Sequence, residues 1–244
     1  MANWCYNCIA IYRKDLRGES LRQIQDLYIK LKSFGTADSI LGEPRKNKDG
    51  VYEPQDWYGN LLMMCGVPEK DVECRGSIQY IGWVDDRYED GGWIKLETET
   101  AWAPQVEDVV GRMLEDYYPD LYYDFIGEEP GCEIYINTDK EGRFFTDRYK
   151  IDYDISETDP RYCDTEYFDN PEDFLERVKE IMKAFKAGVK KKGLPEFVPE
   201  TDVTIPDWEQ AVSYAEQVSK YISEHGDTFD CAYFGAYVFD DSEY

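Results

Sequence analysis

The sequence is poor in the residues that most often build catalytic and metal sites. It has one histidine, His225, and a single CxxC pair, Cys5 and Cys8, so a zinc site built from two such pairs is excluded. No GxGxxG, GxSxG or P-loop pattern occurs, which removes the common dinucleotide, serine-hydrolase and phosphate-binding motifs. These absences favour a protein that is not an enzyme, and we expect no cofactor and no metal ion.

Long apolar runs are missing as well. No stretch of about 18 apolar residues is present, so we expect no membrane-spanning helix and no membrane partner. The first residues, Met1–Cys5, lack the basic and apolar regions of a secretory signal peptide. The seven cysteines lack the spacing of a disulfide framework, which is typical of a reducing compartment. We therefore expect a cytoplasmic location.

Positive charge is scarce. The 244 residues include 52 acidic and 27 basic side chains, for a net charge of -25. Residues 1–84 are balanced, with 11 of each sign, whereas residues 85–170 carry 25 acidic and 8 basic side chains. Such a field repels phosphates, so direct nucleic-acid binding is not expected. It attracts a cationic partner or serves only solubility, and composition leaves both possibilities open.

The clearest local pattern lies between residues 92 and 131. Residues 93–100 alternate in side-chain character, as a half-buried strand does. Pro104 is suited to the first turn of a helix, and Pro119 ends it. A second aromatic strand follows, so the segment is a strand–helix–strand unit. The helix has one apolar stripe, formed by Val106, Val109, Val110, Met113, Leu114 and Tyr117.

Preceding residues complete a larger arrangement. Residues 4–12 predict a strand, and Ser20 with Gln23 has the spacing of a helix-capping box. Residues 36–75 contain a polar insertion, with a short helix predicted at 56–65. Residues 77–84 predict a strand that forms a hairpin with the strand at 93–100. The order strand, helix, strand, strand, helix, strand predicts an α+β fold with a ferredoxin-like split βαβ antiparallel sheet.

The remaining chain predicts extensions of that sheet. Residues 132–155 are expected to form an extra hairpin, which completes a domain at 1–160. Residues 161–244 are expected to form a C-terminal helical addition packed on the first domain, with helices near 170–193 and 206–226. A last aromatic strand is expected at 229–239, where it could complete a sheet.

Three stretches carry a resemblance to a known protein family. Asn3, Trp4, Cys5 and Asn7 stand at the start, Glu99–Pro104 joins the strand to the helix, and Tyr123–Gly131 ends in Glu-Glu-Pro-Gly. Together they resemble the YubB-type ferredoxin-like domain family of phage and conjugative-plasmid proteins, over about residues 1–135. The resemblance implies a mobile-element origin in a bacterial host and a fold, but no activity and no catalytic residues. The Asn-Trp-Gly run expected before Trp93 is missing, and residues 36–75 look inserted.

Two short motifs carry candidate chemistry. Cys5 and Cys8 have the spacing of a redox dithiol, but that motif needs its first cysteine at a helix N-terminus, and here the pair begins a strand. Residues 152–163 begin like a calcium loop, but Glu157 and Cys163 occupy the positions that require glycine and glutamate. We interpret both stretches as structural.

Two functions from different classes remain. In the first, carboxylates along strands imitate nucleic-acid phosphates and block a cationic host protein, such as a defence nuclease, by steric and electrostatic occupation. In the second, the open sheet face binds a small molecule or forms a carboxylate- or metal-dependent active site with Trp93, Tyr123 and the pair Glu128 and Glu129. The candidate partner-binding residues are Glu97, Glu99, Glu128, Glu129, Asp147, Asp152, Asp154, Glu157 and Asp159.

Overall fold

A computed structural model describes the chain over most of its length. The described residues are 3–15, 18–33, 56–85, 92–155, 163–188, 195–200, 207–225 and 233–239. The chain divides into two compact units. Unit 1 runs to Phe145, and unit 2 extends from Thr146 to Asp240.

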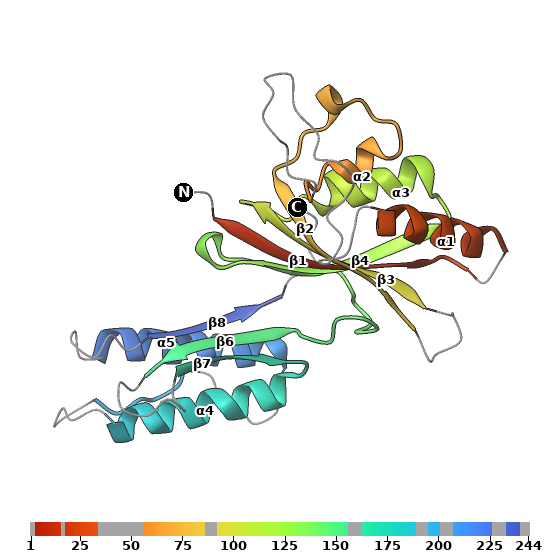
Figure 1. Ribbon diagram of the computed structural model, residues 1–244. Coiled ribbons are helices and arrows are strands. Elements are labelled where there is room, and N and C mark those ends of the chain that lie inside the picture. The colour runs from red at the N-terminus through yellow and green to blue at the C-terminus, as the bar shows by residue number, and fades with distance from the viewer. Residues whose placement is uncertain are drawn as a thin grey trace. The chain divides into compact units, whose positions relative to one another are not determined.

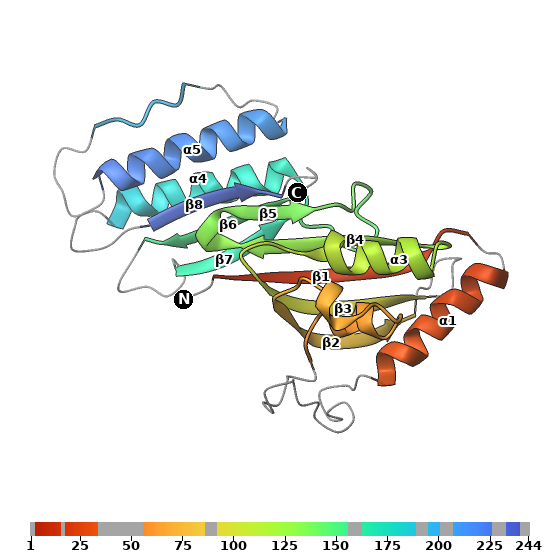
Figure 2. The same cartoon turned by 90° about the horizontal axis from the view of Figure 1, so that it is seen from above.

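Unit 1 is built on a five-stranded antiparallel sheet with the order β2-β3-β1-β4-β5 (Figures 1 and 2). The central strand β1 pairs with β3 on one side and with β4 on the other. The strands are β1 (Trp4–Arg13), β2 (Gly76–Val84), β3 (Trp93–Ala101), β4 (Leu121–Glu129) and β5 (Ile134–Asn137). The helices are α1 (Gly18–Ser33), α2 (Asn60–Met63), η1 (Glu69–Asp71), η2 (Glu107–Gly111), α3 (Arg112–Tyr117) and η3 (Pro130–Cys132).

The helices α1, α2 and α3 lie on the same side of the sheet (Figure 1). This side holds the core of unit 1, because the apolar stripe of α1 meets the buried side chains of β1, such as Ile9 and Ile11. Alternate residues of β1, including Tyr6 and Cys8, point to the other side. We call that second side of the sheet the open face.

Local details of unit 1 differ from the sequence-based expectations. Helix α1 begins at Gly18, so Ser20 is not its cap, and the Ser20 hydroxyl instead donates to the Asp15 carbonyl oxygen at 2.7 Å. The helix expected after Pro104 is a π-helical turn, η2, followed by α3. Its apolar stripe is buried except at Tyr117, as the spacing predicted.

The described part of the predicted insertion contributes to the core. The predicted helix at 56–65 is present as the single turn α2, and Gly66 follows it with a φ of 95°. Residues 36–55 of the insertion lie outside the described part of the chain. The buried residues of its described part are Tyr58, Leu61, Leu62, Val67 and Val72. This segment is therefore an integral part of unit 1.

Unit 2 contains a three-stranded antiparallel sheet with the order β7-β6-β8, packed against two helices. Its strands are β6 (Tyr149–Asp154), β7 (Cys163–Phe168) and β8 (Tyr233–Val238), and its helices are α4 (Pro171–Gly188) and α5 (Trp208–His225). Asn170 and Asp207 cap the helices, accepting from the backbone N–H of Asp173 and Gln210 at 2.9 and 2.8 Å. The two helices were predicted; β7 was not.

The predicted hairpin at 132–155 is wrong, whereas the predicted last strand is present as β8 and belongs to the second sheet. Strand β5 extends the first sheet by pairing with β4, whereas β6 pairs with β7 and β8 in the second sheet. The reason is that the inward side chains of β6, Tyr149, Ile151 and Tyr153, belong to a second hydrophobic core. The chain therefore divides after Phe145 instead of near residue 160, and unit 2 has a sheet of its own.

Candidate functional site

The three stretches that carry the family resemblance meet at one end of the sheet of unit 1. The Trp102 N–H donates to the Asn3 carbonyl oxygen at 3.0 Å, which joins the exit of β3 to the start of β1. The Asn3 amide also reaches the Cys132 sulfur in η3 at 4.0 Å. Because β4 pairs with β1 in register, its last residues arrive at the same place. We call this end of the sheet the motif end.

A buried network of neutral polar side chains underlies the motif end. The Asn7 amide donates to the hydroxyls of Thr100 and Thr98 at 3.0 and 3.2 Å. The Thr100 hydroxyl donates in turn to the Ala103 carbonyl oxygen at 2.6 Å. All three residues are at least 96% buried. Since buried polar groups are costly without partners, this network specifies the path of the chain between β3 and η2.

That path includes two residues in an unfavourable backbone conformation. Trp102 has a φ of 71° and Gln105 a φ of 51°, in the left-handed region that non-glycine residues rarely adopt. The Gln105 amide holds both sides of the turn, donating to the Ala101 carbonyl oxygen at 2.9 Å and accepting from the Arg75 N–H at 3.0 Å. Such residues cost about 1–3 kcal/mol each and persist where surrounding contacts impose them, often at binding sites.

Glu129 is a structural residue and not a surface carboxylate. It is 2% exposed, and its carboxylate accepts from the N–H groups of Gly131 and Cys132, which caps η3. A side chain at position 131 would overlap the Asn3 amide and approach the Glu129 carboxylate. The Glu-Glu-Pro-Gly sequence is thereby explained as a capped turn. The prediction of Glu129 as a partner-binding residue is therefore corrected.

The CxxC cysteines point to opposite faces of the sheet. Cys5 faces the buried network, and its thiol donates to the Asn7 side-chain oxygen at 3.4 Å, while Cys8 lies on the open face opposite Glu97. Burial raises the pKa of Cys5 to about 12 and that of Cys8 to about 11. Both thiols therefore keep their protons at neutral pH, and the pair does not form a dithiol centre.

On the open face, the strand register brings two predicted carboxylates around one aromatic ring. Tyr6 of β1 lies directly opposite Glu99 of β3 and directly opposite Glu128 of β4. Neighbouring strands are about 4.8 Å apart, so the two glutamates flank the tyrosine in a single row across the sheet. Tyr6 is 54% exposed, and Trp4 and Trp102 at the same end are 47% and 48% exposed. We call Trp4, Tyr6, Glu99, Trp102 and Glu128 the aromatic–acidic surface.

The other candidate carboxylates lie outside the row that Glu99, Tyr6 and Glu128 form across the sheet. Glu97 is next along β3, but the Lys95 ammonium binds it at 2.6 Å. Asp152 and Asp154 lie on β6 of unit 2, where Asp152 accepts from the Thr165 hydroxyl at 3.2 Å. Asp147 precedes β6 and is half-buried, which raises the pKa of its carboxyl. Glu157 and Asp159 lie outside the described residues.

The residues of the predicted active site are divided between the two faces of the sheet. Trp93 lies on the open face, with its ring centroid 5.1 Å from that of Phe144, whereas Tyr123 packs on the core side. Glu128 and Glu129 likewise point to opposite faces, because neighbours in a strand alternate. Among the described residues, no three histidine, cysteine, aspartate or glutamate side chains form a group that could hold a metal ion.

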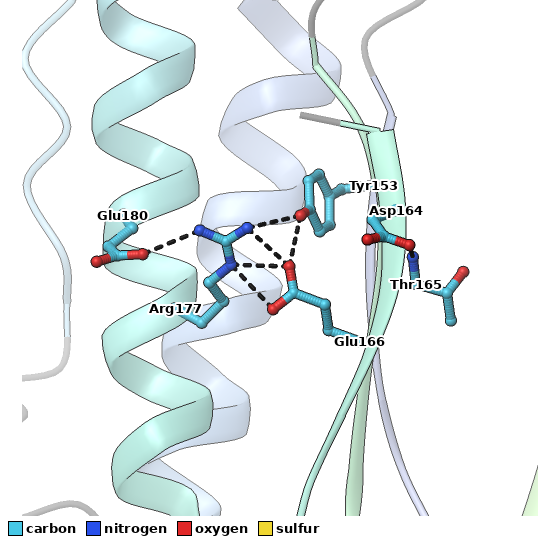
Figure 3. A network of polar contacts seen from close by, with 6 residues as sticks. All are labelled: Tyr153, Asp164, Thr165, Glu166, Arg177 and Glu180. Atoms are coloured by element: carbon cyan, nitrogen blue, oxygen red, sulfur yellow. Dashed lines mark hydrogen bonds and ion pairs between the residues drawn. The ribbon is translucent and has the colours of Figure 1, made fainter. Parts of the chain in front are cut away.

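Unit 2 contains a charged cluster that joins a helix to the sheet (Figure 3). Arg177 of α4 donates to both carboxylate oxygens of Glu166 on β7, at 2.7 to 3.1 Å, and to the Tyr153 hydroxyl at 2.7 Å. Its remaining nitrogen binds Glu180 at 2.9 Å. All three guanidinium nitrogens of Arg177 are engaged inside the cluster, so we interpret the cluster as a structural clamp between α4 and the sheet.

The three comparisons with known proteins give no relative. A scan against protein-family models, a search of curated proteins and a search of solved structures all found no match. None of the helices in the described ranges combines the length and apolar character needed to cross a bilayer.

The aromatic–acidic surface was found only in part from the sequence. Glu99 and Glu128 were predicted from charge, whereas Trp4, Tyr6 and Trp102 were not predicted as binding residues. The alternation of β1 does contain a signal, because it places Trp4 and Tyr6 on one face of the strand and the buried Cys5 and Asn7 on the other. The left-handed conformation of Trp102 has no signal in the sequence.

Proposed function

We propose that this protein binds a cationic segment of a partner protein through the aromatic–acidic surface. The observation that carries the proposal is the exposed Tyr6 ring flanked in register by Glu99 and Glu128, beside the exposed rings of Trp4 and Trp102. Trp102 is exposed at a strained turn, beside the exposed rings of Trp4 and Tyr6 on β1, and a bound partner accounts for the position of these aromatics.

The chemistry of this surface matches arginine and lysine. A guanidinium binds a carboxylate with two parallel hydrogen bonds and also stacks on aromatic faces. Tryptophan and tyrosine are the residues that most often dominate the affinity of protein interfaces. Glutamates at the edges of such a surface attract a basic partner and make its association rate sensitive to salt.

The proposal extends to fold family and origin. The strand order β2-β3-β1-β4, with α1 between β1 and β2 and with η2 and α3 between β3 and β4, supports a ferredoxin-like split βαβ arrangement. The convergence of Asn3–Asn7, Glu99–Pro104 and Tyr123–Gly131 at the motif end supports the resemblance to the phage and plasmid family. In that setting the cationic partner is a host nucleic-acid-binding protein whose phosphate site the carboxylates occupy.

The experiment uses a labelled arginine-rich peptide and the full chain. Binding is measured by fluorescence anisotropy for the wild type and for the double variant Glu99→Gln, Glu128→Gln. The variant is expected to bind about tenfold or more weakly, since two charge-assisted contacts are lost. The matched control is Glu176→Gln, Glu216→Gln, which removes the same charge from exposed positions on α4 and α5. Equal affinity of all three proteins would refute the proposed surface.

A second arm tests the nucleic-acid mimicry. Proteins that bind immobilised wild type but not the Glu99→Gln, Glu128→Gln variant are eluted with salt, and the dominant partner is purified. Duplex DNA is expected to compete with this protein for that partner. A partner that binds DNA and this protein simultaneously would support the interaction with a cationic protein but contradict nucleic-acid mimicry.

A further inference from the structure

Within the described part of the chain, the outer edge of β4 is only partly paired, and it lies beside two hollows. Strand β5 pairs only with the second half of β4, at Ile126 to Glu129. The remaining half, from Leu121 to Asp124, pairs with β1 on one side and has no strand neighbour on the other among the described residues. Paired strands satisfy their backbone groups mutually, so an uncovered edge is a template for another strand.

The pattern of hydrogen bonds shows which groups face outward. The Asp120 carbonyl oxygen accepts from the Lys14 N–H on the β1 side, at 3.0 Å, whereas Phe125 bonds Thr138 through both its N–H and its C=O on the outer side. Backbone groups alternate along a strand, so Tyr123 directs its N–H and C=O outward. Tyr123 is therefore the central pairing position of this edge.

Hollows lie next to both faces of this edge. One has a volume of about 860 Å³ and is lined by Tyr123 together with η2 and α3, and the other has a volume of about 390 Å³ and is lined by Asp124 and the turn after β5. Lys14 and Tyr122 line both hollows. Successive side chains of a strand point to opposite faces, so a strand added here would place alternate side chains in the two hollows.

The charge of the larger hollow selects the occupant. Its described lining includes five carboxylates and two cations, and Arg112 is already engaged by Asp116 at 3.9 Å and by the Asp71 carbonyl oxygen at 3.3 Å. The carboxylates belong to Asp71, Glu73, Glu107, Asp108 and Glu115. The described residues that line the smaller hollow include equal numbers of acidic and basic side chains. Side chains that enter the larger hollow are accordingly cationic.

We propose that the outer edge of β4 binds an extended basic segment of a partner protein by strand addition. In this complex the segment pairs with Tyr123, places its lysine or arginine side chains in the larger hollow, and places small polar side chains in the smaller one. The site is separate from the aromatic–acidic surface and does not depend on the function proposed for that surface.

The test uses a short labelled peptide of alternating lysine and threonine residues with the full chain. In an antiparallel pairing, the residue opposite Tyr123 has its amide toward β4 and its side chain in the larger hollow. Backbone N-methylation of the lysines should therefore weaken binding at least tenfold, whereas N-methylation of the threonines should leave it unchanged. Hydrogen exchange should show new protection of the Tyr123 amide when the peptide binds.

Protein variants separate this site from the other surface. Glu107→Lys, Asp108→Lys should lower the affinity for the peptide at least tenfold, while Glu209→Lys, Glu216→Lys, with the same charge change on α5, should not. The Glu99→Gln, Glu128→Gln variant should bind as the wild type does. Absence of binding, equal binding of both methylated peptides, or an unprotected Tyr123 amide would each overturn strand addition at this edge.

Discussion

The two units use different chemistry to fasten helices to a sheet. In unit 1 the neutral side chains of Asn7, Thr98 and Thr100 lie inside the protein and bond the backbone between β3 and η2. In unit 2 the charged pair Arg177 and Glu166 lies at the border of the core, with exposed fractions of 24% and 29%. The neutral network determines a backbone path, whereas the charged cluster only connects two elements that already pack together.

Because of this difference, we expect changes in the neutral network to affect binding and changes in the charged cluster to affect only stability. A change in the neutral network should alter the shape of the motif end, and with it the surface formed by Trp4, Tyr6 and Trp102. A change in the charged cluster should lower the stability of unit 2 without affecting binding.

The largest effect is expected from Phe174→Ala in the core of unit 2. Phe174 is fully buried, and its ring stacks on that of Tyr149 at 5.0 Å. Its removal should destabilise the unit by about 3–5 kcal/mol. Hydrogen exchange should accelerate in β6, β7 and β8 and stay unchanged in β1 and β3. Equal acceleration in both units would show that they unfold together, and Val198→Ala, at a mostly exposed site, is the control.

The second effect concerns the neutral network. Asn7→Leu keeps the approximate size of the side chain but leaves the hydroxyls of Thr98 and Thr100 without their donor. We expect a loss of about 1–3 kcal/mol in denaturant unfolding of unit 1, because buried polar groups lose their partners. The arginine-rich peptide should also bind more weakly, since the Trp102 turn loses its support. Gln79→Leu, at an exposed position of β2, should change neither quantity.

The third effect concerns the charged cluster. Arg177→Met removes the donor of the Glu166 and Tyr153 hydrogen bonds but keeps much of the apolar stem. Unit 2 should lose about 1–2 kcal/mol, and peptide binding should remain at the wild-type level. Arg22→Met, which breaks an exposed pair with Glu19, should cost about 0–1 kcal/mol. Loss of peptide binding in Arg177→Met would contradict the separation of the two units.

The smallest effect is a pH dependence at Cys5. Burial raises its pKa from 9.0 in the unfolded chain to about 12 in the folded protein. The folded state therefore favours the neutral thiol, so this residue lowers stability as pH rises above 9. Cys5→Ala should remove that part of the alkaline loss of stability. In native protein at neutral pH, alkylation should be slow at Cys5 and faster at the exposed Cys132.

Much of the fold of unit 1 follows from the sequence because its strands are half-buried. Alternation in β3 and the apolar stripe from Val106 to Leu114 identify their elements without knowledge of the rest. The division after Phe145 could not be predicted in this way. Both β5 and β6 are short aromatic strands, and only their pairing partners show that they belong to different sheets.

The candidate site was harder to predict because it depends on register. Charge alone identifies Glu99 and Glu128, but only the pairing of β1 with β3 and β4 places Tyr6 between them. Charge also led to an incorrect assignment. Glu129 is buried and accepts hydrogen bonds from backbone N–H groups, and its neighbour Glu128 faces the other way.

Binding of the arginine-rich peptide to Tyr6→Ala tests the central claim most directly. Tyr6 is exposed and lies on the face opposite the core, so its removal should leave the unfolding transition unchanged. The aromatic–acidic surface predicts a loss of affinity of about tenfold or more, which corresponds to about 1.4 kcal/mol. Tyr117→Ala, at an exposed position of α3, should bind as the wild type does. Wild-type affinity in Tyr6→Ala would contradict the account.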